Sequence, residues 1–170
     1  GIVGSEWIGF KHFIRFFTSN KFIQILKNTV SLSLYSLLAG FPLPIILALL
    51  LNSCPFARFK KAVQTITYAP HFISIVVLVG MVNVFFSPTY GIVGNLLRSL
   101  SIIEGPFMIL TNPKAFPHLY VWSGIWQGLG WNSIIYLGAL SAVDLSLHES
   151  ALIDGANKLQ RMIHIDLPYI

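Results

Sequence analysis

One apolar stretch in the second half of the chain carries side chains suited to holding an uncharged, hydroxyl-rich solute. They are Trp126, Gln127, Asn132 and Tyr136. Aromatic rings offer flat apolar faces, and amides both donate and accept hydrogen bonds, a combination that suits a sugar ring. Gln127 and Asn132 are also costly in lipid, so they must face other helices or a cavity. At this point the sequence is equally compatible with solute-pathway lining and with contacts that hold helices together.

Covalent chemistry finds no support in the residue pattern. The acidic residues are scattered, and no Gly-x-x-x-x-Gly-Lys loop is present to cradle a nucleotide phosphate. The lone Cys54 excludes an internal disulfide. His71 is the one clearly titratable side chain within the long apolar stretches, and a helix-packing role suits it best. We therefore expect no catalytic residue, no metal site and no cofactor on this chain.

The composition indicates a membrane protein. Of the 170 residues, 55% are hydrophobic and 10% are charged, whereas soluble domains carry about 25% charged residues. No charge occurs between Lys27 and Arg58, between Lys61 and Arg98, or from 115 to 143. Each gap exceeds the roughly 20 residues that cross a bilayer core. The net charge of +5 therefore reflects residues flanking a membrane and not a nucleic-acid surface.

We predict an all-α, polytopic transmembrane helical bundle, with residues 1–170 in one membrane domain. The predicted spans are 29–51, 62–84 and 119–143, each helical because lipid offers no partner for backbone polar groups. Pro42 and Pro44 are expected to kink or unwind the first span, and Pro70 to bend the second.

The segments outside the spans also show patterns. Phe10, Phe13, Ile14 and Phe17 form one apolar stripe, which predicts a helix lying in the membrane interface or packed on its own protein. The loop 85–118 holds one potential short helix, 91–97. Trp122 suits an interface anchor. Four glycines would let another backbone approach the third span, and the first two give weak evidence of a dimer face: Gly124, Gly128, Gly130 and Gly138.

A polar segment follows the last span and contains three short motifs. They are Glu149-Ser150-Ala151, Asp154-Gly155-Ala156 and Ile165-Asp166-Leu167-Pro168. Ser146 and Glu149 fit a capping box, which predicts a helix over 147–153. Asp154-Gly155 predicts a turn, 156–164 a second helix, and Pro168 the first turn of another membrane helix. The product is a stiff bracket projecting from the membrane.

These motifs and their order resemble the EAA loop of type I ABC importer permeases, with Ser150 in place of the usual alanine. Further stretches look like sugar permeases of the maltose-uptake kind, and most of all like the branch that handles oligosaccharides or polysaccharide fragments. These stretches are 28–29, 40–42, 47–52, 68–74, 91–97 and 126–140.

The resemblance implies a permease subunit in the bacterial cell membrane, with the loop 144–168 gripped by a separate ATPase subunit that binds ATP and Mg. A second permease subunit and an extracellular sugar-binding protein are the other implied partners. The family has about six spans, so those present here would be the second to the fourth. The residues it assigns to coupling with the ATPase are Glu149, Ser150, Ala151, Asp154, Gly155, Ala156, Leu167 and Pro168.

Two other classes of protein fit less well. An ion-coupled secondary transporter or channel subunit needs charged groups inside the membrane, and the predicted spans hold none. A membrane enzyme needs clustered His, Asp or Glu at an interface. Counting basic residues in the loops does not decide the orientation, so the resemblance places 52–61 and 144–170 inside the cell.

Overall fold

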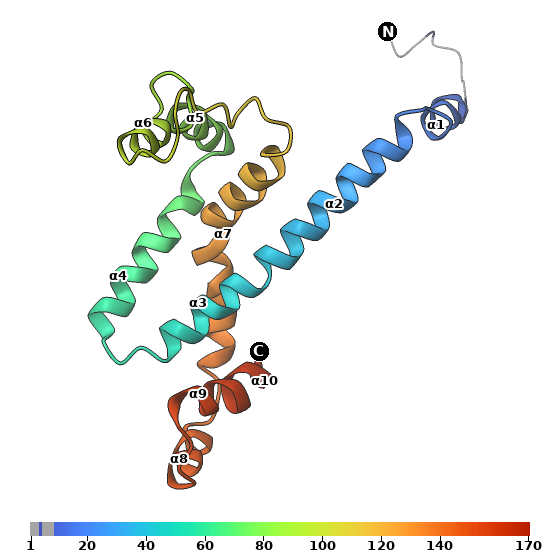
Figure 1. The fold of residues 1–170 in the computed structure, drawn as a ribbon. Coiled ribbons are helices and arrows are strands. Elements are labelled where there is room, and N and C mark those ends of the chain that lie inside the picture. Colours follow the sequence, from blue (N-terminus) through green and yellow to red (C-terminus); the bar gives the residue numbers. More distant parts are fainter. Residues whose placement is uncertain (1–3, 5–8) are drawn as a thin grey trace.

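The computed structural model describes residue 4 and residues 9–170, and all regular structure in that part is helical. The described elements are α1 (Lys11–Phe17), α2 (Phe22–Gly40), α3 (Pro42–Asn52), α4 (Ala57–Tyr68), the 3-10 turn η1 (Ala69–Phe72), α5 (Ile75–Phe85), α6 (Ile92–Ser99), α7 (Phe116–Leu140), α8 (Leu145–Ile153), α9 (Lys158–Arg161), the π-helical turn η2 (Met162–Asp166) and α10 (Leu167–Tyr169). Figure 1 shows α5 and α6 at one end of α7 and the segment from α8 to α10 at the other.

Helices α2 and α3 form one nearly continuous element of 31 residues, Phe22–Asn52. Pro42 and Pro44 cannot donate to the carbonyls one turn earlier, and the helix is interrupted at Phe41. Phe41 nevertheless keeps right-handed helical angles, and its N–H still bonds the Leu37 carbonyl at 2.9 Å. The predicted proline distortion is therefore a local interruption. At 1.5 Å per residue the element is about 46 Å long, more than a bilayer core requires.

The second predicted span is not one helix. The segment Ala57–Phe72 and helix α5 meet at 102°, much more sharply than the predicted bend. The bend lies at Ile73 and Ser74, which are extended, and not at Pro70, which the 3-10 turn accommodates. Ser74 then caps α5, because its Oγ accepts from the Val77 N–H at 3.4 Å.

Length and hydropathy test the predicted spans further. Among the described residues, Phe22–Asn52 is long and apolar enough to cross a membrane, and the bent pair qualifies as a second span only if both halves count as one. Helix α7 has 25 residues but does not reach the same hydropathy. Its glycines, amides and tryptophans lower the average, so the span predicted over 119–143 stays a prediction.

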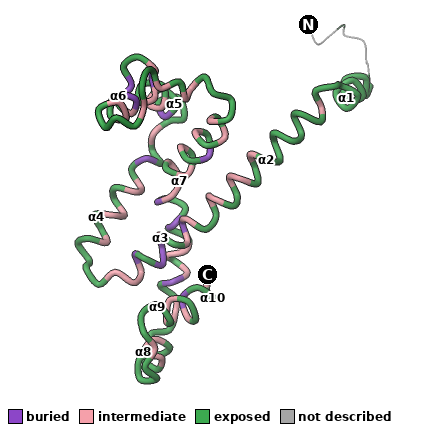
Figure 2. Tube along the Cα trace, viewed as in Figure 1, coloured by how far each residue is buried: buried purple, intermediate pink, exposed green. Residues whose placement is uncertain are grey.

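Helix α7 is the centre of the packing, with α2, α3, α4 and η1 against it. Ala48 and Leu49 of α3 meet Leu140 of α7 in a buried cluster. Figure 2 shows buried residues where α3 and α7 cross, whereas α1 and α2 contain none. His71 of η1 stacks flat on Trp131 of α7 with ring centroids 4.3 Å apart, consistent with its predicted packing role.

Close approach to α7 depends on one of its four glycines. A Cβ on Gly130 would lie 2.3 Å from the Thr67 carbonyl oxygen of α4. Within the described chain nothing lies within 4 Å of a Cβ on Gly124 or Gly138, and Gly128 meets only the Asn132 side chain of its own helix. The predicted close approach of backbones is thus confirmed at Gly130 alone, and no described contact supports the Gly124–Gly128 dimer face.

The outer segments match their predictions in part. Helix α1 carries the predicted stripe, with Phe10 76% and Phe13 62% exposed, and its contact with lipid stays a prediction. Residues 22–28, assigned before the first span, already belong to α2, while residues 1–3 and 5–8 lie outside the described part. The short helix expected over 91–97 is present as α6.

Replacing Gly130 by alanine should separate α4 from α7, because the added carbon meets backbone that cannot rotate away. We expect a loss of about 1–3 kcal/mol, the usual cost of overpacking. Thermal unfolding of the detergent-solubilised protein measures it. Gly138→Ala on the same helix has free space, and because alanine is the better helix former it should keep the melting temperature or raise it slightly; equal melting of the two variants would contradict the packing argument.

Candidate functional site

The polar segment after α7 folds into a bracket, defined here as residues 144–168 (Figure 1). Its first arm is α8, and its second arm runs through α9, η2 and the start of α10. The arms are joined at residues 154–157. The bracket projects from the end of α7 that lies opposite α5 and α6, as the sequence predicted.

Asp144 begins the first arm. Its Oδ1 accepts a hydrogen bond from the Ser146 N–H at 2.9 Å, and its backbone is extended. This hydrogen bond holds the pKa of Asp144 below its ordinary value, so the carboxylate is ionised at neutral pH and complements the helix dipole. The predicted capping box of Ser146 and Glu149 is therefore wrong: Ser146 is already inside α8, because the anionic side chain two residues earlier takes its N–H.

The turn between the arms is a Schellman motif, which ends a helix with two backbone hydrogen bonds. The N–H of Ala156 bonds the Ala151 carbonyl at 2.8 Å, and that of Gly155 bonds the Leu152 carbonyl at 3.1 Å. Gly155 has φ +78°, a left-handed conformation that glycine adopts without steric cost. The predicted turn is confirmed.

The second arm differs from the predicted helix over 156–164. A reciprocal capping box of Asn157 and Gln160 starts it at Lys158, with bonds of 2.8 and 2.9 Å. From Met162 the helix widens into the π turn, where the Leu167 N–H reaches back to the Met162 carbonyl. Pro168 lies in the first turn of α10, where its missing N–H costs nothing, as predicted.

The structure brings together only some of the residues that were predicted to couple the chain to an ATPase subunit. A hollow of about 310 Å³ at the turn is lined by Ala151, Asp154, Gly155, Ala156, Gln160, Arg161, His164 and Ile165. Glu149 and Ser150 are exposed on α8, and Leu167 and Pro168 are exposed on α10, outside this hollow. Sequence reasoning missed the four lining residues of the second arm. Residues 160–161 and 164–165 are one helical turn apart and so share a face of the helix, and this spacing was the signal available in the sequence.

The tip of the bracket is apolar and open. Ile153 is 86% exposed and Leu152 is 60% exposed. Exposed apolar side chains of this size are typical of a surface that another protein covers. In the second arm the Arg161 Nε is buried without a hydrogen-bond partner in the described chain.

The four candidate pathway residues do not form one site. Gln127 donates through Nε2 to the Ile73 carbonyl at 2.6 Å, so it holds the bend between η1 and α5. Asn132 and Tyr136 line one hollow of about 580 Å³ between α2, α3 and α7, with Trp131 beside them. Trp126 lines a different, apolar hollow of about 550 Å³. A pathway role for these side chains stays a prediction.

Two further observations concern Trp122 and metal binding. Trp122, predicted as an interface anchor, donates to the Tyr35 hydroxyl of α2 at 2.9 Å. In the part of the chain that the structure describes, no three His, Cys, Asp or Glu side chains gather where they could hold a metal ion.

Known proteins similar to the chain point to one family. Residues 40–170 match the family described as "Binding-protein-dependent transport system inner membrane component". The whole chain is 47% identical to the polygalacturonan/rhamnogalacturonan transport system permease protein YteP of Bacillus subtilis (strain 168) and covers 52% of it. It is 41% identical to Protein LplB of the same organism, over 100% of the chain and 53% of that protein. The chain thus spans about half the length of these relatives.

A solved structure shares the fold. It is the crystal structure of a bacterial ABC transporter involved in the import of the acidic polysaccharide alginate, with a TM-score of 0.91 and 45% identity over 98% of this chain and 58% of the matched chain. A bacterial alginate ABC transporter in complex with an alginate pentasaccharide-bound periplasmic protein matches with a TM-score of 0.90 and 45% identity, over 96% of this chain and 56% of the matched chain.

These matches confirm the resemblance inferred from the motifs, the all-α fold and the similarity to sugar and polysaccharide permeases. The chain belongs to the family of binding-protein-dependent transport system inner membrane components.

Proposed function

We propose that this chain is part of the permease subunit of an ATP-driven importer that moves an oligosaccharide across the bacterial cell membrane. Similar proteins support the substrate class, since the name of one specifies polygalacturonan and rhamnogalacturonan and the description of another specifies alginate. Family membership supports the membrane location. The bracket then faces the cytoplasm, and the chain crosses the membrane several times.

The observation that carries the proposal is the bracket itself. It turns at Gly155, and its exposed tip at Leu152 and Ile153 gives a second protein an apolar surface to cover. A separate ATPase subunit is the partner we propose, with ATP and Mg bound on that subunit. A second permease subunit completes the pathway, and an extracellular binding protein delivers the sugar.

In this proposal, ATP binding closes the ATPase subunits and carries the bracket with them. The second arm reaches the membrane helices through Met162, which packs against the cluster of Ala48, Leu49 and Leu140. Movement of the bracket therefore displaces the ends of α3 and α7 together. The helices switch from an inward-facing to an outward-facing arrangement, and the sugar enters from the binding protein.

The first prediction concerns the power source. The full-length protein should co-purify with an ATPase subunit, and in proteoliposomes it should import oligosaccharide only when ATP, Mg and the binding protein are present. Radiolabelled sugar uptake measures this. Import that persists without ATP and follows an imposed ion gradient would favour a secondary transporter instead.

A second prediction concerns Gly155. Proline there cannot adopt φ +78° and removes the N–H that bonds the Leu152 carbonyl, so the arms should lose their fixed angle. We expect sugar uptake to fall about tenfold or more, equivalent to about 1.4 kcal/mol of coupling, while the subunit stays in the membrane and ATP hydrolysis continues. Gly155→Asn is the matched control, because asparagine tolerates left-handed angles, and it should keep most uptake. Normal uptake by Gly155→Pro would count against the coupling role.

A further inference from the structure

One carboxylate of the bracket is withdrawn from water. Asp166, at the end of η2, is 4% exposed and is the one buried charged residue in the described part of the chain. Burying a carboxylate is unfavourable by several kcal/mol unless a cation or hydrogen-bond donors compensate it. Its position between the apolar residues Ile165 and Leu167 therefore requires a partner close by.

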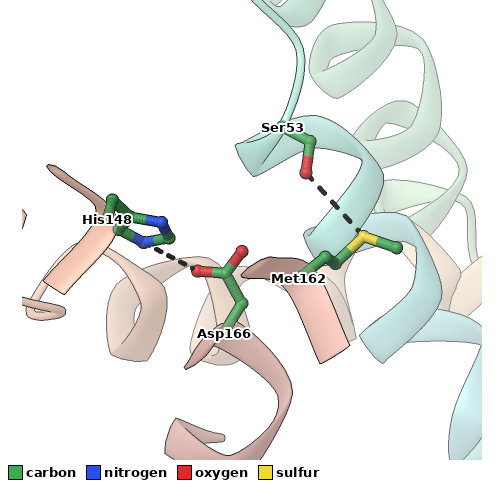
Figure 3. A network of polar contacts seen from close by, with 4 residues as sticks. All are labelled: Ser53, His148, Met162 and Asp166. Atoms are coloured by element: carbon green, nitrogen blue, oxygen red, sulfur yellow. Dashed lines mark hydrogen bonds and ion pairs between the residues drawn. The ribbon is translucent and has the colours of Figure 1, made fainter. Parts of the chain in front are cut away.

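That partner is His148, which belongs to the other arm. Its Nε2 lies 3.2 Å from Asp166 Oδ1, and its side chain is 22% exposed (Figure 3). No other cationic and anionic side chains come within 4 Å of each other among the described residues. The Oδ1 atom has no hydrogen-bond donor of suitable geometry, so the imidazole nitrogen at 3.2 Å is the polar group that stands nearest to it across the two arms.

The pair of His148 and Asp166 joins the two arms of the bracket at a distance from the turn. The Schellman turn at Gly155 joins the end of α8 to the start of the second arm. His148, near the start of α8, and Asp166, at the end of the second arm, join the opposite ends. The bracket is therefore fastened at both ends of its arms.

The second arm is also fastened to the membrane helices. Met162, one turn before Asp166, packs against the cluster where α3 meets α7. The Ser53 hydroxyl at the end of α3 lies 3.8 Å from the Met162 sulfur (Figure 3). One arm thus holds α8 through Asp166 and rests on the membrane helices through Met162.

We propose that the pair of His148 and Asp166 is a clamp that passes a load on α8 to the second arm, and from there through Met162 to α3 and α7. Both are positioning residues, since neither is assigned a contact with nucleotide or sugar. The inference rests on the proposed function, because a load on α8 implies an ATPase subunit docked there.

The test uses the complete transporter in proteoliposomes and measures sugar imported per ATP hydrolysed. His148→Leu removes the imidazole nitrogen and leaves the buried carboxylate beside an apolar side chain, so the second arm should swing toward water. We expect about a tenfold fall in sugar imported per ATP, with the ATPase still bound. His148→Gln keeps a nitrogen donor at similar reach and should stay within about twofold of the wild type. Lys158→Ala, an exposed change on the second arm, is the matched control.

A chemical bridge separates a clamp from a general effect on folding. Cysteines at both positions, His148→Cys and Asp166→Cys with Cys54→Ser, abolish the contact of His148 with Asp166 and allow a short reducible bis-thiosulfonate linker to join the arms. Sugar imported per ATP should be low before linking, recover after it and fall again on reduction. Transport that is unchanged by His148→Leu, or that does not respond to the linker in an assembled complex, overturns the clamp.

The two proposals fail differently. If the wild-type protein binds no ATPase subunit or imports sugar without ATP, the proposed function is wrong. If the wild type passes both checks and His148→Leu transports sugar with normal yield per ATP, only the clamp is wrong. If His148→Leu does not assemble, as judged by membrane yield and co-purified ATPase, the linker experiment decides.

Discussion

The joint between α3 and α7 is the contact on which the rest of this structure depends. Ala48, Leu49 and Leu140 form the buried cluster, and Met162 of the bracket packs against it. Alanine at position 48 is fully buried and small enough to bring the two helices close. Because this cluster receives side chains from α3, α7 and the bracket, it is where, in the proposed function, movement of the bracket reaches the helices.

Much of the architecture follows from local sequence, and the exceptions share a cause. Charge-free stretches indicated helices, Asp154-Gly155 indicated the turn, and Pro168 the start of α10; each signal is contained within a few neighbouring residues. The 102° bend was underestimated because it depends on Ser74 as a cap and on Gln127, 54 positions away in sequence from the Ile73 carbonyl that it bonds. The His148–Asp166 pair was missed for the same reason, since nothing in either residue's neighbourhood specifies the other.

The polar side chains of α7 show how one residue type serves different purposes. Gln127 and Asn132 looked equivalent in the sequence, because both amides are unfavourable in lipid. Gln127 donates a hydrogen bond to the Ile73 carbonyl, which is left free where the helix breaks. This contact holds the helices together. Asn132 is exposed and lines hollows between α2, α3 and α7, and it remains the better candidate for contact with a solute. Only the position of the break in a neighbouring helix distinguishes them.

The shape of the bracket and its attachment have different physical origins. The Asp144 cap, the Schellman turn and the Asn157–Gln160 box are hydrogen bonds between residues at most five apart, so they need no other part of the fold. The contacts of Met162 and Asp166 are long-range and exist only when the helices and both arms are in place. The bracket's shape is set by local hydrogen bonds, whereas its attachments are tertiary contacts. It can therefore move as one body while the contacts at its base change. That division is what a lever between a soluble motor and a membrane pathway requires.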